Sequence, residues 1–300
     1  MEIIRELKTI PNLSAALGFF DGLHLGHQAV INCAVNYARE KNCPAAVVTF
    51  KHHPFCYLQG MKAPKYILTR DEKYRLLDGM GVDYVIELDF DAIKDLSAEE
   101  YVRDILVKYF SPVGISTGFS HYFGKDKSGN VNLLTEWQRK YNYSYFATPA
   151  KTLYGVKISS TAVRNYIKGG NVDLAEALLG RKFAIAGTVQ KGKRKGHKLG
   201  FPTANIFYPL EIIQPPRGVY DVNVVLDNGS RHRGVANYGV CPTVTDSGIT
   251  SFEVHILNFD EDIYGKDIKI EFNRKIRDEI KFENLDQLKL QITFDINSLK

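Results

Sequence analysis

Short apolar runs alternate with longer amphipathic stretches over the first half of the chain. The apolar runs at 14–20, 45–50 and 84–88 predict buried strands, and the spacing of apolar residues between them predicts helices. Thr69 and Ser97 each precede acidic residues in the pattern that opens a helix, and at Ser97 this pattern is a capping box. Because strands and helices alternate, we expect a parallel sheet with right-handed crossovers, in which ligands bind at the carboxyl ends of the strands. The other elements expected here are helices at 26–41, 70–80, 97–110, 133–141, 160–168 and 171–179, and strands at 114–118 and 143–148.

The pattern changes in the second half of the chain. From 183 to 274, short apolar runs are separated by turns rich in Gly, Pro and Asn, which is typical of consecutive strands without helices. The turn Asp227-Asn-Gly229 predicts a hairpin, and residues 285–297 have the periodicity of an amphipathic helix. The sequence therefore predicts two domains, an α/β domain at 1–182 and a small β-barrel with a terminal helix at 183–300.

The composition is that of an ordinary globular protein. Hydrophobic residues make up 44% of the 300 residues and charged residues 24%. No apolar run approaches the roughly 20 residues that span a bilayer, and the N-terminus lacks the apolar core of a signal peptide. The four cysteines show no C-x-x-C spacing, so neither a zinc knuckle nor a disulfide framework is indicated. We expect a cytoplasmic protein without a membrane partner, and its oligomeric state stays open.

The charge excess is small and local. Lys and Arg total 39 against 34 Asp and Glu, a net charge of +5, and the part after residue 183 holds 16 basic and 15 acidic residues. Proteins dedicated to nucleic acids are more basic than this. The densest basic run lies at 191–198, and binding of RNA or an acidic partner through it is an alternative that stays open. We expect no nucleic-acid partner.

The segment Gly18-Phe-Phe-Asp-Gly-Leu-His-Leu-Gly-His27 lies where the first expected strand meets the first expected helix. His24 and His27 are three residues apart, so on a helix they share one face and can contact one ligand. A helix N-terminus presents free N–H groups and partial positive charge, which suit a phosphate, and Gly22 and Gly26 allow a ligand to approach closely. Capping or metal binding by the histidines is the alternative. The position after a strand favours phosphate binding.

A second polar cluster, Lys157-Ile-Ser-Ser-Thr-Ala-Val-Arg164, opens another expected helix. Ser159, Ser160 and Thr161 supply hydroxyls, and the Arg164 guanidinium can form two hydrogen bonds to a phosphate. Alone, such a string is typical of a helix cap. Paired with the histidine segment, it predicts the second wall of a triphosphate site.

Several ordered motifs resemble one family over nearly the whole chain. The segments at 18–27, 49–54, 118–124 and 158–164 resemble the FMN adenylyltransferase domain of bacterial bifunctional riboflavin kinase/FAD synthetases. The riboflavin kinase barrel of the same family is similar to the motifs at 200–205, 218–220, 234–243, 253–265 and 276–282. The resemblance implies a Rossmann-like nucleotidyltransferase domain followed by a six-stranded barrel.

The resemblance implies two reactions, riboflavin plus ATP to FMN, and FMN plus ATP to FAD and pyrophosphate. In the second, the FMN phosphate itself attacks the α-phosphorus of ATP, so positioning and charge stabilisation suffice. The resemblance makes His24 and His27 catalytic and places His53 and Pro54 on the flavin side. The ATP contacts that it implies are Gly18, Phe19, Asp21, Gly26, Ser159, Ser160, Thr161 and Arg164.

The kinase reaction needs a group that accepts the proton of a ribityl hydroxyl. The resemblance assigns this role to Glu253, and it assigns Mg²⁺ binding to Thr203 and Asn205, whose side chains offer oxygen ligands. Taken alone, Glu253 is more typical of a solvated strand carboxylate, and Pro-Thr-Ala-Asn of a plain turn. The further contacts implied are Gly196, Lys198, Gly200, Pro202 and Thr203 for ATP, and Asn237 and Arg277 for the flavin.

The chain departs from the family pattern at four positions. Ser120 stands where Asp or Asn is usual, and His121 replaces the following Phe. His52 replaces a Pro, and His197 replaces an Arg of the kinase loop, which gives up a permanent charge near phosphate. We expect both activities to survive. A chain with only one working activity is the alternative, and the adenylyltransferase is the activity more affected.

Overall fold

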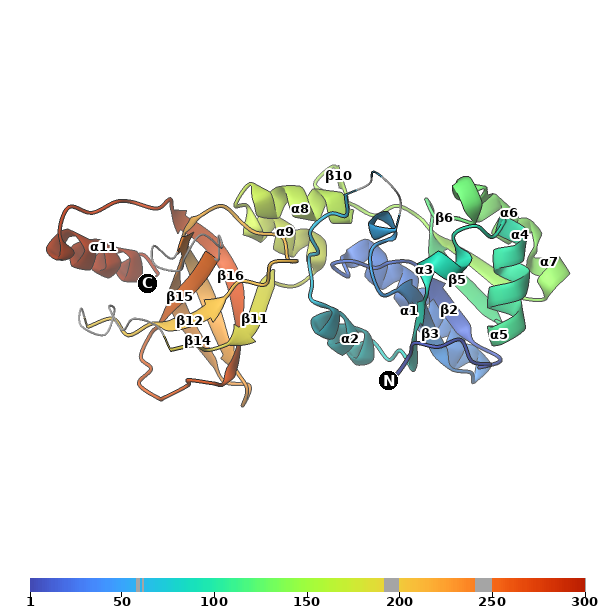
Figure 1. Cartoon of the computed structure of the whole chain (residues 1–300), viewed down its shortest axis with the longest axis horizontal. Coiled ribbons are helices and arrows are strands. Elements are labelled where there is room, and N and C mark those ends of the chain that lie inside the picture. The colour runs from blue at the N-terminus through green and yellow to red at the C-terminus, as the bar shows by residue number, and fades with distance from the viewer. Residues whose placement is uncertain (58–59, 61, 192–199, 241–249, 300) are drawn as a thin grey trace. The chain divides into compact units, whose positions relative to one another are not determined.

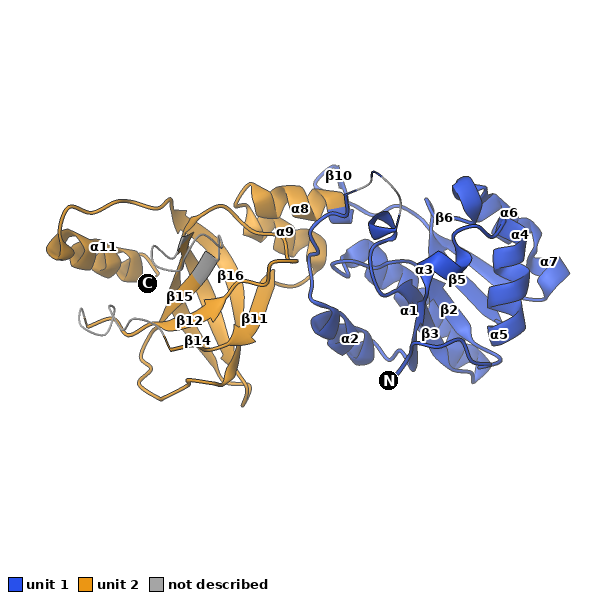
Figure 2. Ribbon diagram, in the orientation of Figure 1, with its two compact units in different colours: residues 1–160 blue, residues 161–300 orange. Residues whose placement is uncertain are grey.

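The computed structural model describes the chain except residues 58–59, 61, 192–199, 241–249 and 300. It divides into two compact units, residues 1–160 and 161–300 (Figure 2). The domain boundary that we predict after residue 182 stays a prediction.

The first unit is built on a parallel sheet, as predicted, and this sheet has six strands. Strand β1 was not expected, because three residues are too few to show a period of two. It pairs with β4 at the edge of the sheet. In spatial order the strands are β1 (Glu2–Ile4), β4 (Tyr84–Leu88), β3 (Ala45–Phe50), β2 (Ser14–Leu17), β5 (Gly114–Gly118) and β8 (Ser144–Thr148).

Helices cover both faces of this sheet (Figure 1). Alternate residues of β2 enter different cores: Ala16 packs with α1 (Leu25–Lys41) and α2 (Arg70–Gly79), whereas Ala15 and Leu17 face the other side. Ser97 forms the capping box that the sequence predicts. The helices on that other side are α3 (Phe90–Ile93), α4 (Ala98–Glu100), the π-helical turn η2 (Tyr101–Val107), α5 (Lys108–Phe110), α6 (Val131–Glu136) and α7 (Gln138–Tyr141).

Several short elements lie in the loops at the carboxyl end of the sheet. None has a length that periodicity could detect. They are the 3₁₀ turns η1 (Pro54–Cys56) and η3 (Lys125–Lys127), and the two-residue strands β6 (Tyr122–Phe123), β7 (Gly129–Asn130), β9 (Thr152–Leu153) and β10 (Val156–Lys157).

The second unit combines helices with a six-stranded antiparallel near-barrel. A bridge between Gln190 and Asn205 brings the two ends of the sheet together, which closes most of the barrel. The hairpin turn at Asp227-Asn-Gly229 is confirmed, with Gly229 at φ 82°. The elements are α8 (Ser160–Lys168), α9 (Val172–Leu179), and, in spatial order, β11 (Ala184–Thr188), β16 (Asp267–Arg277), β13 (Gly218–Leu226), β14 (Arg231–Val240), β15 (Thr250–Ile256) and β12 (Ala204–Phe207).

Aromatic side chains fill the barrel. Tyr220, Phe252 and Phe272 are fully buried, and the ring of Phe272 contacts both of the others edge to face. The expected terminal helix, α11 (Leu285–Asn297), is confirmed. Its Asp295 is buried against the barrel, whereas Leu290 and Phe294 are exposed.

Candidate active sites

The turn between β2 and α1 accounts for several residues of the first motif. β2 ends at Leu17, not at residue 20 as expected, because Phe20 (φ 56°) and Gly22 (φ 80°) adopt left-handed backbone that a strand cannot contain. A Cβ on Gly22 would lie 2.8 Å from Ile67 Cδ1, so this position requires glycine. The Asp21 carboxylate accepts a hydrogen bond from the main-chain N–H of Ile67 at 3.0 Å. These contacts fix the loop that leads into α1.

The two histidines of this motif stack at the N-terminus of α1. His24 is buried, and its Nδ1 accepts a hydrogen bond from the main-chain N–H of His27 at 3.2 Å. The ring centroids are 3.6 Å apart, and Phe20 packs edge to face on the His27 ring. His24 therefore caps α1, which is the capping role that the sequence left open as an alternative. Because its Nδ1 is an acceptor, the neutral ring carries its proton on Nε2, which makes Nε2 a donor.

The histidines line a cavity of about 280 Å³ at the carboxyl ends of β2, β5 and β8. The Ser160 hydroxyl donates to the Asp21 carbonyl oxygen at 2.9 Å and so ties the second motif to the first. Thr161 and Arg164 belong to the second unit, and their ATP contacts stay predictions. The predicted residues that this cavity brings together are Gly18, Phe19, His24, Gly26, His27, Ser159 and Ser160.

Two lysines on the wall of this cavity were not predicted as site residues. Lys151 and Lys157 follow β8, and the Lys157 ammonium lies 4.4 Å from the ring centroid of Phe119. Their position after the carboxyl end of an expected strand is a signal that could have found them. They add positive charge where phosphates would bind.

A second cavity of about 770 Å³ shares part of its wall with the first. His53 and Pro54, the predicted flavin-side residues, line it together with Phe19, and the rings of Phe19 and His53 meet edge to face at 5.0 Å. Residues common to both walls are Leu17, Gly18, Phe19 and His121. The other aromatic side chains on this wall are Phe50, Phe55, Tyr57, Phe90, Tyr101, Tyr122 and Phe123.

Lys73 on α2 is a buried cation that the sequence analysis missed. Its Nζ donates hydrogen bonds to the Phe19 carbonyl oxygen at 2.6 Å and to Thr49 Oγ1 at 3.1 Å. Burial lowers the pKa of Lys73 to about 8, although the carboxylates of Asp21 and Glu87 act in the opposite direction. Nothing in the sequence distinguishes this lysine from the exposed ones of an amphipathic helix.

In the barrel, three predicted polar residues lie side by side on neighbouring strands. Glu253 on β15 pairs with Asn205 on β12 and, on its other side, with Asn237 on β14. Cross-strand partners point to the same face of a sheet. Since Phe252 and Val254 are buried in the core, the three polar side chains lie on the outer face of the barrel.

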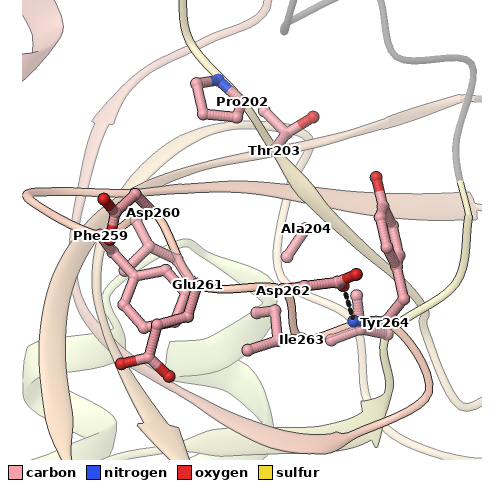
Figure 3. A pocket seen from close by; sticks show the side chains of 11 residues that line it. Pro202, Thr203, Ala204, Phe259, Asp260, Glu261, Asp262, Ile263 and Tyr264 are labelled. Atoms are coloured by element: carbon pink, nitrogen blue, oxygen red, sulfur yellow. Dashed lines mark hydrogen bonds between the residues drawn. The ribbon is translucent and has the colours of Figure 1, made fainter.

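A cavity of about 410 Å³ lies at the start of β12 (Figure 3). Pro202 and Thr203 lie on one side of it and the segment 259–264 on another. His255 Nδ1 donates to the Pro202 carbonyl oxygen at 2.8 Å, which fixes this turn. Among the described residues, neither Glu253 nor Asn205 lines the cavity. The sequence analysis did not assign the segment 259–264 to the site, although Asp262 and Tyr264 belong to a motif of the resemblance.

The remaining barrel predictions have different outcomes. Gly200 has the left-handed φ of 86° that favours glycine, whereas Gly196 and Lys198 lie outside the described residues. Arg277 forms a bidentate ion pair with the buried Asp295 at 2.8–3.1 Å. This pair fastens α11 to β16. The flavin contact of Arg277 stays a prediction.

The first unit has a Rossmann-like parallel sheet with a candidate site at the carboxyl ends of its strands, and the second is a near-barrel with a candidate site of its own. Family models for FAD synthetase and riboflavin kinase match residues 7–162 and 179–300. The bifunctional riboflavin kinase/FMN adenylyltransferase of Haemophilus influenzae is 35% identical over 306 residues, covering 100% of this chain and 98% of that protein. The Escherichia coli K12 enzyme of the same name is 38% identical over 303 residues, covering 97% and 96%. The chain belongs to the bifunctional riboflavin kinase/FMN adenylyltransferase family, as its motifs predict.

A solved structure from Streptococcus pneumoniae, titled a macrolide-efflux protein, shares the fold. It aligns with a TM-score of 0.87 at 31% identity and covers 98% of this chain and 97% of its own. Within the described part of our chain, no helix has the length and apolar character needed to cross a bilayer.

Proposed function

We propose that the first unit transfers the adenylyl group of ATP to FMN across its two adjoining cavities. The smaller cavity offers glycines, imidazoles, hydroxyls and two lysines, which suit the phosphates of a nucleotide. The larger one has aromatic walls and a volume in the range of small-molecule sites, which suit a flavin ring. The common wall at Gly18 and Phe19 carries this proposal, because the FMN phosphate must reach the α-phosphorus of ATP.

In this step an oxygen of the FMN phosphate forms a bond to the α-phosphorus while the bond to the β-phosphate oxygen breaks. Pyrophosphate leaves with the electron pair, so no protein base is required. The His24 Nε2–H, the His27 ring and the N-terminus of α1 act as donors to the phosphate oxygens, where charge accumulates. Lys151 and Lys157 attract the pyrophosphate end.

We propose that the barrel transfers the γ-phosphoryl group of ATP to riboflavin. The apolar side chains of the 410 Å³ cavity, which include Ile256 and Phe259, suit the planar base of the nucleotide. Glu253 accepts the proton of the ribityl hydroxyl as its oxygen bonds to the γ-phosphorus, and ADP leaves. The register that places Asn205 and Asn237 beside Glu253 carries this proposal, because both amides can orient the hydroxyl.

Thr203 and Asn205 fit a magnesium ion in this reaction. They are two residues apart where β12 begins, and hydroxyl and amide oxygens are the hard ligands that Mg²⁺ accepts. Mg²⁺ usually takes one or two protein ligands beside substrate phosphates. When bound, the ion would neutralise charge on the ATP phosphates.

One assay tests both activities. Purified protein is incubated with ATP and MgCl₂ and with either riboflavin or FMN, and the flavins are separated by chromatography. We expect FMN from riboflavin and FAD from supplied FMN, and excess EDTA should abolish both products. Absence of one product contradicts the proposal for that unit and supports the alternative of a single working activity.

We also propose that the protein works in the cytoplasm, where ATP is available. The described cysteines Cys33, Cys43 and Cys56 are free thiols, which suits a reducing compartment. Cell fractionation with an antibody against the chain tests this location.

A further inference from the structure

His121 lies on the common wall of the two cavities in the first unit. Four residues line both cavities, and the other three are Leu17, Gly18 and Phe19. His121 is therefore the member of this set whose side chain can form hydrogen bonds. His121 follows β5, and its main-chain N–H donates a hydrogen bond to the carbonyl oxygen of Gly118 at 3.1 Å. The ring stacks on Phe123, with an angle of 22° between the planes and 5.8 Å between the centroids.

The Nε2 atom of this ring is buried and has no hydrogen-bond partner among the residues that the structure describes. A buried polar atom without a partner costs roughly 1–3 kcal/mol, so such atoms are uncommon unless ordered water or a ligand satisfies them. An unpartnered buried nitrogen on a residue that lines both cavities indicates a binding role.

We propose that His121 is a substrate-contacting residue of the adenylyltransferase, whose Nε2–H donates a hydrogen bond to a phosphate oxygen where the two cavities meet. The inference rests on the proposed adenylyl transfer, in which the FMN phosphate and the α-phosphate of ATP meet at this wall. His121 gives up no proton in the step. Its hydrogen bond stabilises the oxygens that gain negative charge as the new P–O bond forms and pyrophosphate leaves.

The protonation state of His121 agrees with this role. Burial lowers the pKa of His121 to about 4, so the ring is neutral near pH 7 and has one N–H group to donate. A neutral donor can stabilise developing charge without the desolvation cost of a buried cation.

The variants His121→Phe and His121→Gln test the proposal. Phe keeps the size and stacking of the ring and removes both nitrogens, whereas Gln keeps an N–H donor of similar reach. We expect His121→Phe to lower kcat/KM for FAD formation from FMN and ATP on the order of 10²-fold. His121→Gln should recover at least part of this loss. Varying the concentrations of FMN and ATP in turn shows which substrate's phosphate His121 contacts. If the contact exists in the bound substrate, the KM for that substrate rises. If the contact forms only in the transition state, kcat falls.

Stability separates this role from a structural one. The single tryptophan, Trp137, lies in the first unit, so its fluorescence follows unfolding of that unit. We expect His121→Phe to unfold at an equal or higher urea concentration, because it removes an unsatisfied buried atom. Wild-type kcat and KM values in His121→Phe would overturn the proposal. A loss of activity that is accompanied by lower stability and is not relieved in His121→Gln would overturn it as well. If wild-type protein forms no FAD, the proposed adenylyl transfer itself is wrong.

Discussion

The ammonium group of Lys73 donates a 2.6 Å hydrogen bond to the carbonyl oxygen of Phe19. Phe19 lines both of the cavities described in the first unit, so a residue of α2 holds the wall that they share. The same ammonium bonds Thr49 at the end of β3. Lys73 thus connects the loop after β2 to the end of the neighbouring strand β3, and it contributes to the site by positioning the Phe19 backbone.

We predict that Lys73 makes the stability of the first unit depend on pH in alkaline solution. Its pKa falls from 10.5 to about 8 on folding because of burial, so between these values the unfolded chain binds more protons than the folded one. Unfolding free energy must therefore rise with pH across this window, by roughly 3 kcal/mol from this group. Urea unfolding followed by Trp137 fluorescence at pH 8, 9 and 10 measures the slope.

The matched variant for this prediction is Lys73→Met, which keeps an unbranched stem and cannot titrate. The two proteins share every other titrating group, so the difference between their slopes isolates Lys73. We expect the variant to be less stable at pH 10, because it leaves the Phe19 carbonyl oxygen without its donor. Parallel slopes for the two proteins would show that Lys73 titrates normally and is not buried as described.

We predict that His24 has two separable functions, a helix cap and a phosphate donor. His24→Ala should lose about 1 kcal/mol of stability, because the His27 N–H loses its acceptor. His24→Asn supplies a replacement cap oxygen and should unfold like the wild type. Both variants lack the imidazole, so FAD formation should fall on the order of 10²-fold in each.

The measurements are Trp137 unfolding curves and chromatographic rates of FAD formation. Riboflavin phosphorylation by the second unit is the internal reference and should not change. Full FAD-forming activity in His24→Asn would mean that His24 acts as a cap alone.

Local sequence signals predicted much of this fold, but they could not predict features that depend on contacts between residues distant in the sequence. The bounds of β3, β4 and α11 coincide with the expected ones, because their apolar spacing and flanking turns are local. The end of β2 was placed too late, since the apolar residues at 18–20 continue the pattern although Phe20 and Gly22 take left-handed backbone.

In the candidate sites, too, local relations could be predicted from the sequence and long-range contacts could not. Motif spacing brought His24 and His27 to one helix end, because that relation is a matter of a few residues along the chain. Lys73 could not be predicted, since its role depends on the Phe19 carbonyl of another loop, 54 positions away. The register of Asn205 with Glu253 likewise depends on the pairing of β12 with β15.

We predict that Glu253→Gln abolishes the kinase reaction and spares the adenylyltransferase. Gln keeps the size of the side chain and the register with Asn205 and cannot accept a proton. The rate of FMN formation from riboflavin should fall about 10²- to 10⁴-fold, the contribution usual for a general base. Glu211→Gln, at an exposed carboxylate of the same unit, is the control and should keep the wild-type rate. A Glu253→Gln protein that still forms FMN rapidly would show that Glu253 is a solvated strand carboxylate.

Arg277 and Asp295 allow a test of whether a predicted flavin residue serves structure, binding or both. Asp295→Leu should destabilise the second unit by about 3–5 kcal/mol, because it leaves the largely buried guanidinium without its partner. The double variant Arg277→Met/Asp295→Leu should recover most of this loss, since apolar residues then replace both charges. Circular dichroism during thermal unfolding measures these effects. In the double variant, with α11 still docked, we expect the KM for riboflavin to rise because the flavin contact of Arg277 is gone. An unchanged KM would restrict Arg277 to fastening α11.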